Sequence, residues 1–396
     1  MHHLHLHSWV SFQTPRYTCR HTKPSSRYVR MVRTRAAASK PTGEKLKRAR
    51  REFEGRTAPK ALRGTVVVDL GRDLEEAIFV RRPSRRNRSP YVCDVRLVAG
   101  GTECIAHVPN LDSGGKMRAG VRVLCSRQKG VTAGSLGPHG TPKCELIARL
   151  LRCEDRENAN TPDGGVWVSA HPALAEQIAL GLLKQGALDD RLHPSPIVKG
   201  EGIRTQKMLR RQSTESVSQH YRPDFSIDHE DGSTTILEVK QVVDTDYSRE
   251  FVMDQAHAQT PHPAYAPKAE KYTRAGIFPW GRRGQQGPSG EKVVSARAIE
   301  HLRELSELAS KEEGSGRVHP CVLFICGRAD AEGFRPNGAA CPSFAKYLTE
   351  ARQKGVRVLV QSVRWGVGED VGKAFDGGPL EVWSDLEEDD EFVVKS

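Results

Sequence analysis

Three residues that could cleave a phosphodiester stand close together in the middle of the chain. Asp224 is followed by Glu238 and Lys240, fourteen and sixteen residues later. Between them, residues 229–233 read His-Glu-Asp-Gly-Ser, which is typical of a tight turn between two strands. A hairpin centred on Asp231 would set the two carboxylates nearly opposite one another. Because alternate residues of a strand share a face, Glu238 and Lys240 should point the same way.

Two carboxylates and one ammonium on one face suit a metal-dependent reaction. The carboxylates can hold a hard cation, Mg²⁺ or Mn²⁺, that keeps positions open for water and phosphate. Such a cation polarises the phosphoryl oxygen and lowers the pKa of its water, while a lysine orients that water or neutralises developing charge. We therefore predict Asp224 and Glu238 as metal ligands, and these two together with Lys240 as catalytic residues. The alternative is an ordinary exposed strand face, because Glu-x-Lys is a common pattern.

Residues 62–156 predict a small β-barrel of the OB type. Gly, Pro and Ser clusters separate short stretches that alternate or are rich in β-branched residues, with no convincing helix. The predicted strands are Gly64–Leu70, Ala77–Arg82, Tyr91–Val98, Glu103–Val108, Val121–Ser126 and Cys144–Leu151. The basic loop Arg81–Arg88 is an insertion between two of them. Such barrels bind single strands or oligosaccharides on one face, and the alternative is a structural barrel without a ligand.

Residues 157–384 predict an α/β domain. Apolar residues at helical spacing indicate helices, and short apolar runs indicate strands. We expect helices at His171–Gly186, Ser295–Lys311 and Phe344–Lys354, and strands at Asp224–Asp228, Thr235–Val243, Cys321–Cys326 and Val356–Val363. The strand–helix–strand order near the C-terminus implies parallel pairing. Residues 255–292 are interpreted as an irregular inserted loop, and 385–396 as a solvated acidic tail.

The net charge of +12 is concentrated near the N-terminus. Residues 1–43 hold eight Lys or Arg and no acidic residue, and 44–90 hold fourteen basic and seven acidic residues. Of the 61 basic and 49 acidic residues, 39 and 42 therefore remain beyond residue 90. The whole-chain charge is thus no evidence that the folded part binds nucleic acid.

The acid-free N-terminal segment has the composition of an organelle transit peptide. It is rich in Arg, Ser, Thr and His and lacks the apolar stretch of a secretory signal. We interpret 1–43 as a transit peptide for chloroplast or mitochondrion, with the plastid favoured, and 44–61 as a linker. The alternatives are a disordered basic arm that touches nucleic acid, or a true start at Met31. No apolar run approaches the ~18 residues of a membrane span, so we expect no membrane partner.

The nine cysteines favour a reducing compartment. They are scattered, without a Cys-x-x-Cys pair, which disfavours a disulfide framework or a zinc site. Cys321 and Cys326 lie in an apolar run and are expected in the core.

The barrel has few aromatic residues for base stacking. Aromatics are nearly absent between Val92 and Leu150. Any binding of strands would therefore use backbone contacts from basic side chains and would depend strongly on salt. The candidate contacts are Arg96, Arg118, Arg122, Arg127 and Lys129.

Over about residues 62–365 the chain resembles the sugar fermentation stimulation protein family. Five segments match the family's motifs in order and spacing: Ile105–Asn110, Tyr221–Phe225, Leu237–Lys240, Ala298–Leu305 and Leu323–Phe334. The resemblance implies an OB-like barrel followed by a nuclease-like domain of the PD-(D/E)XK type. It also implies DNA binding, with nuclease action proposed from the fold.

The resemblance adds further candidate residues. His107, Asn110 and His301 lie in matching motifs, and Ser295 and Arg297 stand where the family has Thr-Arg. We expect His107, Asn110, Arg297 and His301 to contact nucleic acid. Glu176, on the first helix of the domain, is a candidate third metal carboxylate, as in many nuclease-like domains; the alternative is a surface helix residue.

The chain also departs from the family. Residues 111–115 differ from the family's Gly-Ser-Met-like stretch, and Trp280 stands where an Asp is usual. These departures bear on the DNA-facing side more than on the metal ligands.

Three functions remain open. The first is a Mg²⁺-dependent nuclease of DNA or structured nucleic acid, which the intact Asp, Glu and Lys set favours. The second is a non-catalytic DNA- or RNA-binding regulator that uses a nuclease-like fold. The third is a sugar- or protein-binding regulator, which the aromatic-poor barrel disfavours.

Overall fold

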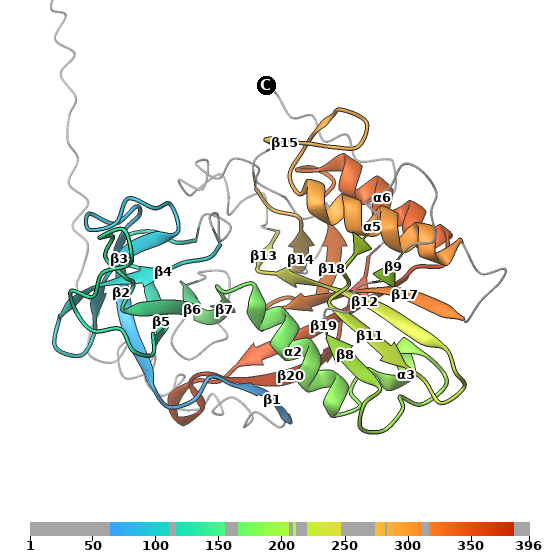
Figure 1. The fold of residues 1–396 in the computed structure, drawn as a ribbon, viewed down its shortest axis with the longest axis horizontal. Coiled ribbons are helices and arrows are strands. Elements are labelled where there is room, and N and C mark those ends of the chain that lie inside the picture. Colours follow the sequence, from blue (N-terminus) through green and yellow to red (C-terminus); the bar gives the residue numbers. More distant parts are fainter. Residues whose placement is uncertain are drawn as a thin grey trace, which may run out of the picture. The chain divides into compact units, whose positions relative to one another are not determined.

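The computed structural model describes residues 64–110, 116–154, 165–205, 209–210, 220–246, 274–281, 283–310 and 317–383 (Figure 1). The predicted N-terminal segment, the predicted linker at 44–61 and the acidic tail at 385–396 lie outside them. No helix in the described ranges has the length and apolar character that a membrane span requires.

The first part of the described chain is a closed five-stranded barrel, as predicted. Its strands run in the order β4-β3-β2-β5-β6, and β4 pairs with β6 to close the ring. Their bounds are β2 Leu74–Arg81, β3 Val92–Leu97, β4 Glu103–His107, β5 Arg122–Arg127 and β6 Leu146–Glu154. The interior is packed mainly with small and β-branched side chains.

The second part is an α/β domain around a seven-stranded mixed sheet. The strand order is β1-β20-β19-β17-β12-β11-β8. Strands β17 and β19 are parallel as predicted, and β12 also pairs parallel with β17. The bounds are β1 Val66–Asp69, β8 Ile203–Thr205, β11 Phe225–Asp228, β12 Thr234–Val242, β17 Val318–Cys326, β19 Arg357–Trp365 and β20 Lys373–Pro379.

Helices cover both faces of this sheet (Figure 1). The helices are α2 Ala173–Lys184, α3 Asp189–Leu192, α5 Ala296–Ala309 and α6 Pro342–Gln353, with a 3₁₀ turn, η3, at Gly368–Asp370. Leu237 and Val239 of β12 pack with α2, whereas Ile236 and Val242 pack with α5 and α6. Alternation along β12 therefore places successive residues on opposite faces. Burial of each large apolar side chain stabilises the fold by about 1.5–3 kcal/mol.

Smaller sheets complete the fold. A four-stranded sheet has the order β13-β14-β18-β21, and two hairpin-like pairs are β9–β10 and β15–β16. The bounds are β9 Leu209–Arg210, β10 His220–Tyr221, β13 Asp244–Thr245, β14 Ala275–Phe278, β15 Gln285–Gln286, β16 Lys292–Val293, β18 Gly333–Pro336 and β21 Glu381–Val382.

The first predicted barrel strand, Gly64–Leu70, belongs to the other sheet. Strand β1 pairs antiparallel with β20 rather than with a barrel strand. It also lies against α2, where a Cβ on Gly181 would come within 2.1 Å of the Val67 carbonyl oxygen. A strand with alternating apolar residues fits either sheet. Its place is set by two long-range contacts, the pairing with β20 about 300 residues away and the close packing on Gly181.

The predicted boundary at 156/157 also differs from the structure. Strand β7, Gly165–Ser169, pairs with β6 and extends the barrel sheet. Ser169 then meets the α/β domain: its backbone N–H donates to Gly327 O at 3.1 Å, and Trp365 Nε1 donates to its hydroxyl at 3.0 Å. Residues 165–169 thus serve both parts, which residue patterns alone do not reveal.

The predicted inserted loop at 255–292 is irregular only in part. Residues 247–273 lie outside the described ranges, but Ala275–Phe278 forms β14, with Ala275 to Ile277 buried. It pairs with both β13 and β18. The short Ala-Gly-Ile-Phe run was concealed by the Pro- and Gly-rich sequence around it.

Candidate functional site

The hairpin predicted around Asp231 is confirmed. Strands β11 and β12 pair antiparallel, with Phe225 opposite Leu237 and Asp228 opposite Thr234. Continuing this register by one residue sets Asp224 opposite Glu238. Asp224 Oδ2 accepts a hydrogen bond of 2.7 Å from the backbone N–H of Val239, which fixes the carboxylate against the neighbouring strand.

Glu238 lies at the centre of a chain of polar contacts. Lys240 Nζ donates to Glu238 Oε1 at 2.5 Å, and His301 Nδ1 contacts the same oxygen. On the outer side, Arg297 Nε donates to His301 Nε2 at 3.3 Å. Because Nε2 accepts this bond, Nδ1 carries the proton of the neutral ring and donates to Glu238. We call Asp224, Glu238, Lys240 and His301 the carboxylate centre.

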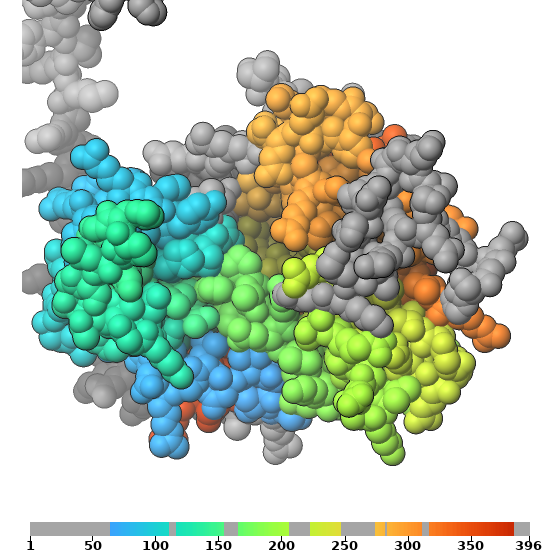
Figure 2. Space-filling view, in the orientation of Figure 1, coloured from blue at the N-terminus to red at the C-terminus, as the bar shows by residue number. Residues whose placement is uncertain are grey.

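Two elements position these side chains. Glu238 and Lys240 lie two residues apart on β12 and share a face, as predicted; this face is the one that α5 covers. Arg297 and His301 lie one turn apart on α5, whose buried residues Ile299, Leu302 and Leu305 hold the helix on the sheet. In the space-filling view, yellow atoms from 220–246 reach the surface between the green of α2 and the orange of α5 (Figure 2).

The pKa values of the two carboxylates move in opposite directions. Burial, and next the charge of Glu238, raise the pKa of Asp224 to about 6, although the hydrogen bond from Val239 and the charge of Lys240 oppose this. Burial also acts to raise the pKa of Glu238, but the hydrogen bond from His301 and the charge of Lys240 outweigh it and lower this pKa. Glu238 is therefore ionised at neutral pH, and its negative charge disfavours ionisation of Asp224.

This arrangement fits a hard divalent cation. In the described part of the chain, Asp224 Oδ1 receives no hydrogen bond, and Asp224 faces a second, ionised carboxylate. A pair of carboxylates that disfavour each other's ionisation is relieved by a bound cation. Carboxylate oxygens are also the donors that Mg²⁺ takes, one or two from the protein and the rest from water and phosphate.

Glu176 is near this pair but not in a cluster with it. It lies in the first turn of α2, half-buried, and its charge contributes to the raised pKa of Asp224. Among the described residues, no group of three or more His, Cys, Asp or Glu side chains converges tightly enough to hold a metal ion. The assignment of Glu176 as a third ligand therefore stays a prediction.

Three predicted arginine contacts of the barrel lie in ion pairs with glutamates. Arg122 Nε pairs with Glu76 at 2.5 Å, and Arg127 Nε pairs with Glu75 at 2.6 Å. Arg96 pairs more loosely, at 3.7 Å, with Glu103. Their positive charge is locally balanced, so a phosphate would have to compete with a carboxylate.

The remaining predicted nucleic-acid contacts divide between the barrel and α5. His107 ends β4, where burial lowers its pKa, and the Asn110 carbonyl accepts a bond of 3.0 Å from Arg82. Arg297 is exposed next to the carboxylate centre. The direct contact of His301 with Glu238 was not predicted from the sequence. The four-residue spacing of Arg297 and His301, which places both on one helix face, was the available sign that they act together.

The matching family model and the matching relatives carry the same family description. A family model described as "SfsA: Sugar fermentation stimulation protein RE domain" matches residues 292–368. A sugar fermentation stimulation protein homolog of Acidithiobacillus ferrooxidans is 41% identical over 72 residues, 18% of this chain and 29% of the relative. The homolog of Citrifermentans bemidjiense is 42% identical over 67 residues, 17% of this chain and 27% of that protein. The matched stretches thus span less than a third of these relatives.

The solved structure of Pyrococcus furiosus SfsA in complex with Ca²⁺ has the same fold. It aligns with a TM-score of 0.50 at 18% identity and covers 81% of this chain and 99% of the other. These comparisons support the resemblance of this chain to the sugar fermentation stimulation protein family. The resemblance recognised in the sequence, and the predicted order of barrel and α/β domain, are confirmed. The family model includes α5 with Arg297 and His301, whereas Asp224, Glu238 and Lys240 precede it.

Proposed function

We propose that this protein binds DNA and cleaves its phosphodiester bonds with Mg²⁺ or Mn²⁺ at the carboxylate centre. The observation that carries the proposal is the pairing of Asp224 and Glu238 on one sheet face, with the pKa of Asp224 raised to about 6 beside an ionised neighbour. Perturbed carboxylates that face one another are typical of sites that bind a cation or transfer protons. The structural relative carries Ca²⁺, a hard cation that oxygen donors also bind.

Each side chain then has a distinct task. Asp224 and Glu238 would hold the cation, which when bound lowers the pKa of water and polarises phosphate. Lys240, held by Glu238 at 2.5 Å, would orient the attacking water or neutralise charge on the phosphate. His301 keeps Glu238 ionised and fixes its orientation through Nδ1. Arg297, exposed beside His301, would contact the DNA backbone.

Cleavage of labelled single- and double-stranded DNA tests the proposal. Full-length protein would be assayed with Mg²⁺, Mn²⁺, Ca²⁺ or EDTA, beside an Asp224→Asn/Glu238→Gln variant. We expect metal-dependent cleavage that falls by at least about 100-fold in this variant. Glu230→Gln is the matched control, because Glu230 is an exposed carboxylate in the turn of the same hairpin. Equal cleavage by the double variant and wild type would exclude the carboxylate centre as the active site.

A second candidate is a DNA- or RNA-binding regulator without catalysis. The favouring observation is that Glu238 is only 2% exposed, with Oε1 already in contact with Lys240 and His301. Those contacts could satisfy the carboxylate without a metal. Tight binding by wild type, with no cleavage under any metal condition and no change in the double variant, would favour this function.

We also propose import into a plastid or mitochondrion, on the basis of the acid-free, Arg- and Ser-rich composition of residues 1–43. A fluorescent protein fused behind these residues should enter the organelle. Replacing the eight basic residues with Gln should abolish its import. Cytosolic fluorescence of the unaltered fusion would contradict the proposal.

A further inference from the structure

The densest run of positive charge in the barrel is the loop between β2 and β3. Residues 81–88 read Arg-Arg-Pro-Ser-Arg-Arg-Asn-Arg, five arginines without an acidic residue. The five arginines have different environments. Two of them hold the loop in place, and three point outward.

The loop is braced from within by a buried serine. Ser84 is 2% exposed, and its hydroxyl donates to Asp94 Oδ1 of β3. The same hydroxyl oxygen accepts hydrogen bonds from the backbone N–H groups of Arg86 and Asn87, at 3.0 and 3.3 Å. Asp94 Oδ2 accepts the backbone N–H of Arg85 at 3.0 Å. Four consecutive residues are thus tied to one strand.

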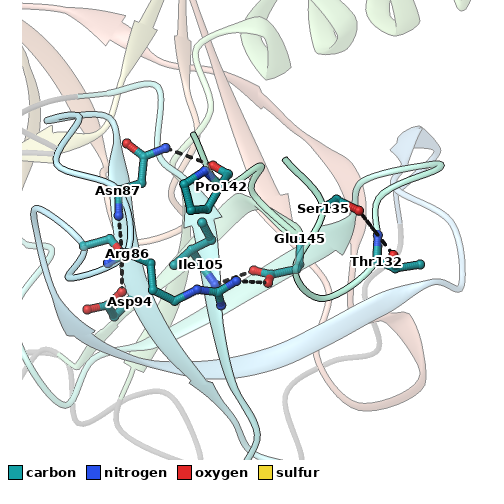
Figure 3. Close-up of polar contacts among 9 residues, drawn as sticks. Arg86, Asn87, Asp94, Ile105, Thr132, Ser135, Pro142 and Glu145 are labelled. Carbon is teal, nitrogen blue, oxygen red and sulfur yellow. Dashed lines mark hydrogen bonds and ion pairs between the residues drawn. The ribbon is translucent and has the colours of Figure 1, made fainter. Parts of the chain in front are cut away.

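Arg86 and Asn87 anchor the loop to the segment directly before β6 (Figure 3). Arg86 Nη2 pairs at 2.7 Å with Oε1 of the buried Glu145, whose second oxygen accepts the backbone N–H of Ile105 at 2.7 Å. Asn87 Nδ2 donates to Pro142 O at 3.0 Å. In the close-up, both side chains point from the loop toward the segment 142–145.

The other anchor is Arg82, whose Nη1 donates to Asn110 O at 3.0 Å. Asn110 ends the segment that follows β4, and Lys116, six residues later, is ion-paired with Asp244. Asp244 follows Lys240 by four residues in the same stretch of chain. Arg82 thus ties the loop to residue 110, and Lys116 is tied to β13, which directly follows the strand that carries the carboxylate centre.

The three remaining arginines lack a carboxylate partner among the described residues. Arg81, Arg85 and Arg88 are exposed, and Arg81 Nε donates a hydrogen bond of 3.2 Å to Pro83 O. By contrast, Arg96, Arg122 and Arg127 on the strands are each paired with a glutamate. The loop therefore carries three uncompensated charges, whereas these three strand arginines are compensated.

We propose that Arg81, Arg85 and Arg88 form a DNA-binding surface in which a braced loop presents three guanidinium groups to the phosphate backbone. This inference rests on the proposed function and specifies where the barrel holds DNA. A guanidinium matches a phosphate with two parallel hydrogen bonds. Because the internal contacts already fix the backbone, little loop freedom is lost when DNA binds. The loop contacts are to phosphates, so they favour no base sequence.

Two triple variants of full-length protein test the inference. Arg81→Gln/Arg85→Gln/Arg88→Gln removes the three unpaired charges, and Arg96→Gln/Arg122→Gln/Arg127→Gln removes three paired ones from the same barrel. Both lower the net charge by three, so non-specific attraction falls equally. Arg82 and Arg86 are left in place because they brace the loop. Binding of a labelled DNA duplex would be measured in EDTA over a series of salt concentrations.

For the loop variant we expect a loss of affinity of about 10- to a few hundred-fold at about 0.1 M salt. Each phosphate contact raises the binding constant by up to about eightfold when the salt concentration falls from about 1 M to about 0.1 M. The slope of log K against log salt should fall by about two to three. The strand variant should lose less than about threefold. Equal losses in the two variants would overturn the inference. A labelled RNA hairpin would be measured in parallel, and a loop variant that loses RNA binding while keeping DNA binding would also overturn it.

The wild-type protein separates this inference from the proposed function. If wild type does not bind DNA, DNA binding itself fails, and the loop proposal fails with it. If wild type binds DNA and the loop variant binds equally well, only the loop assignment is wrong. Thermal unfolding of both variants should stay within a few degrees of wild type, because all six side chains are exposed.

Discussion

Two groups of charged side chains in the α/β domain, one partly buried and one buried, differ in how their charges are balanced. The first is the carboxylate centre. The second, which we call the arginine–aspartate cluster, consists of Arg274, Arg328 and Asp330, each 4% exposed or less. Arg328 donates to both oxygens of Asp330 at 2.5 Å, and Arg274 Nη1 donates to Oδ2 at 3.1 Å.

The pKa values of Asp330 and Asp224 are shifted in opposite directions. Burial opposes the ionisation of Asp330, but the charge and hydrogen bonds of Arg328, together with Arg274, lower its pKa to about 2. In the carboxylate centre, burial and the charge of Glu238 raise the pKa of Asp224 to about 6. Two cations around one carboxylate form a satisfied structural group, whereas two facing carboxylates leave negative charge that a cation would relieve.

The largest expected effect separates activity from stability at the carboxylate centre. Asp224→Asn should lower metal-dependent DNA cleavage by about 100- to 1,000-fold, since it removes a charged metal ligand. The free energy of unfolding should not fall, and should rise by about 1 kcal/mol or more at neutral pH, because the repulsion from Glu238 is removed. Cleavage kinetics and urea unfolding measure the two. A large loss of stability would mean that the centre is structural.

The converse is expected at the arginine–aspartate cluster. Asp330→Asn should lower the free energy of unfolding by about 3–5 kcal/mol, because it removes the negative charge that two buried guanidinium groups share. The control Asp370→Asn removes the exposed partner of Lys373 and should cost less than about 1 kcal/mol. Urea unfolding of the two variants makes the comparison. Similar small losses would show that the cluster contributes little.

Divalent cations should stabilise only one of the two groups. Ca²⁺ or Mg²⁺ at 100 times its dissociation constant should raise the free energy of unfolding of wild type by about 2.7 kcal/mol. Asp330→Asn should keep this stabilisation, and Asp224→Asn/Glu238→Gln should lose it. Thermal unfolding with and without the cation measures the effect. An equal cation response in the carboxylate variant would place the binding site elsewhere.

Acid should affect the arginine–aspartate cluster over a defined range. The pKa of Asp330 is lower in the folded state than its ordinary value of 3.8, so its contribution is fully present above about pH 4. That contribution, about 2 kcal/mol, is lost as the pH falls from about 4 toward 2. Urea unfolding between pH 5 and pH 2.5 should show a steeper loss for wild type than for Asp330→Asn. Parallel curves would contradict the lowered pKa.

Local pattern was enough to predict the hairpin of the carboxylate centre. The turn residues and the equal spacing about Asp231 set the register, and strand alternation set the shared face of Glu238 and Lys240. These are consequences of backbone geometry over about fifteen residues. The helix carrying Arg297 and His301 was predicted from apolar spacing in the same way. Its contact with Glu238, across 63 residues, depends on how α5 packs on the sheet.

Long-range pairing was beyond what residue pattern could decide. The predicted barrel strand at Gly64–Leu70 pairs instead with β20, and its alternation is compatible with either sheet. The arginines of the barrel look equivalent in sequence, yet the fold pairs Arg122 and Arg127 with glutamates of β2 and leaves Arg85 exposed without a carboxylate partner among the described residues. Charge compensation depends on which strands are neighbours.

The sequence by itself indicated the family resemblance, the order of barrel and α/β domain, and the identities of the two facing carboxylates. These follow from short-range periodicity, turn chemistry and motifs, which act over a few residues. Only the tertiary structure decided which charges are balanced and which are not. Burial and the distance to an opposite charge set that balance, and both are properties of the packed chain rather than of any local segment.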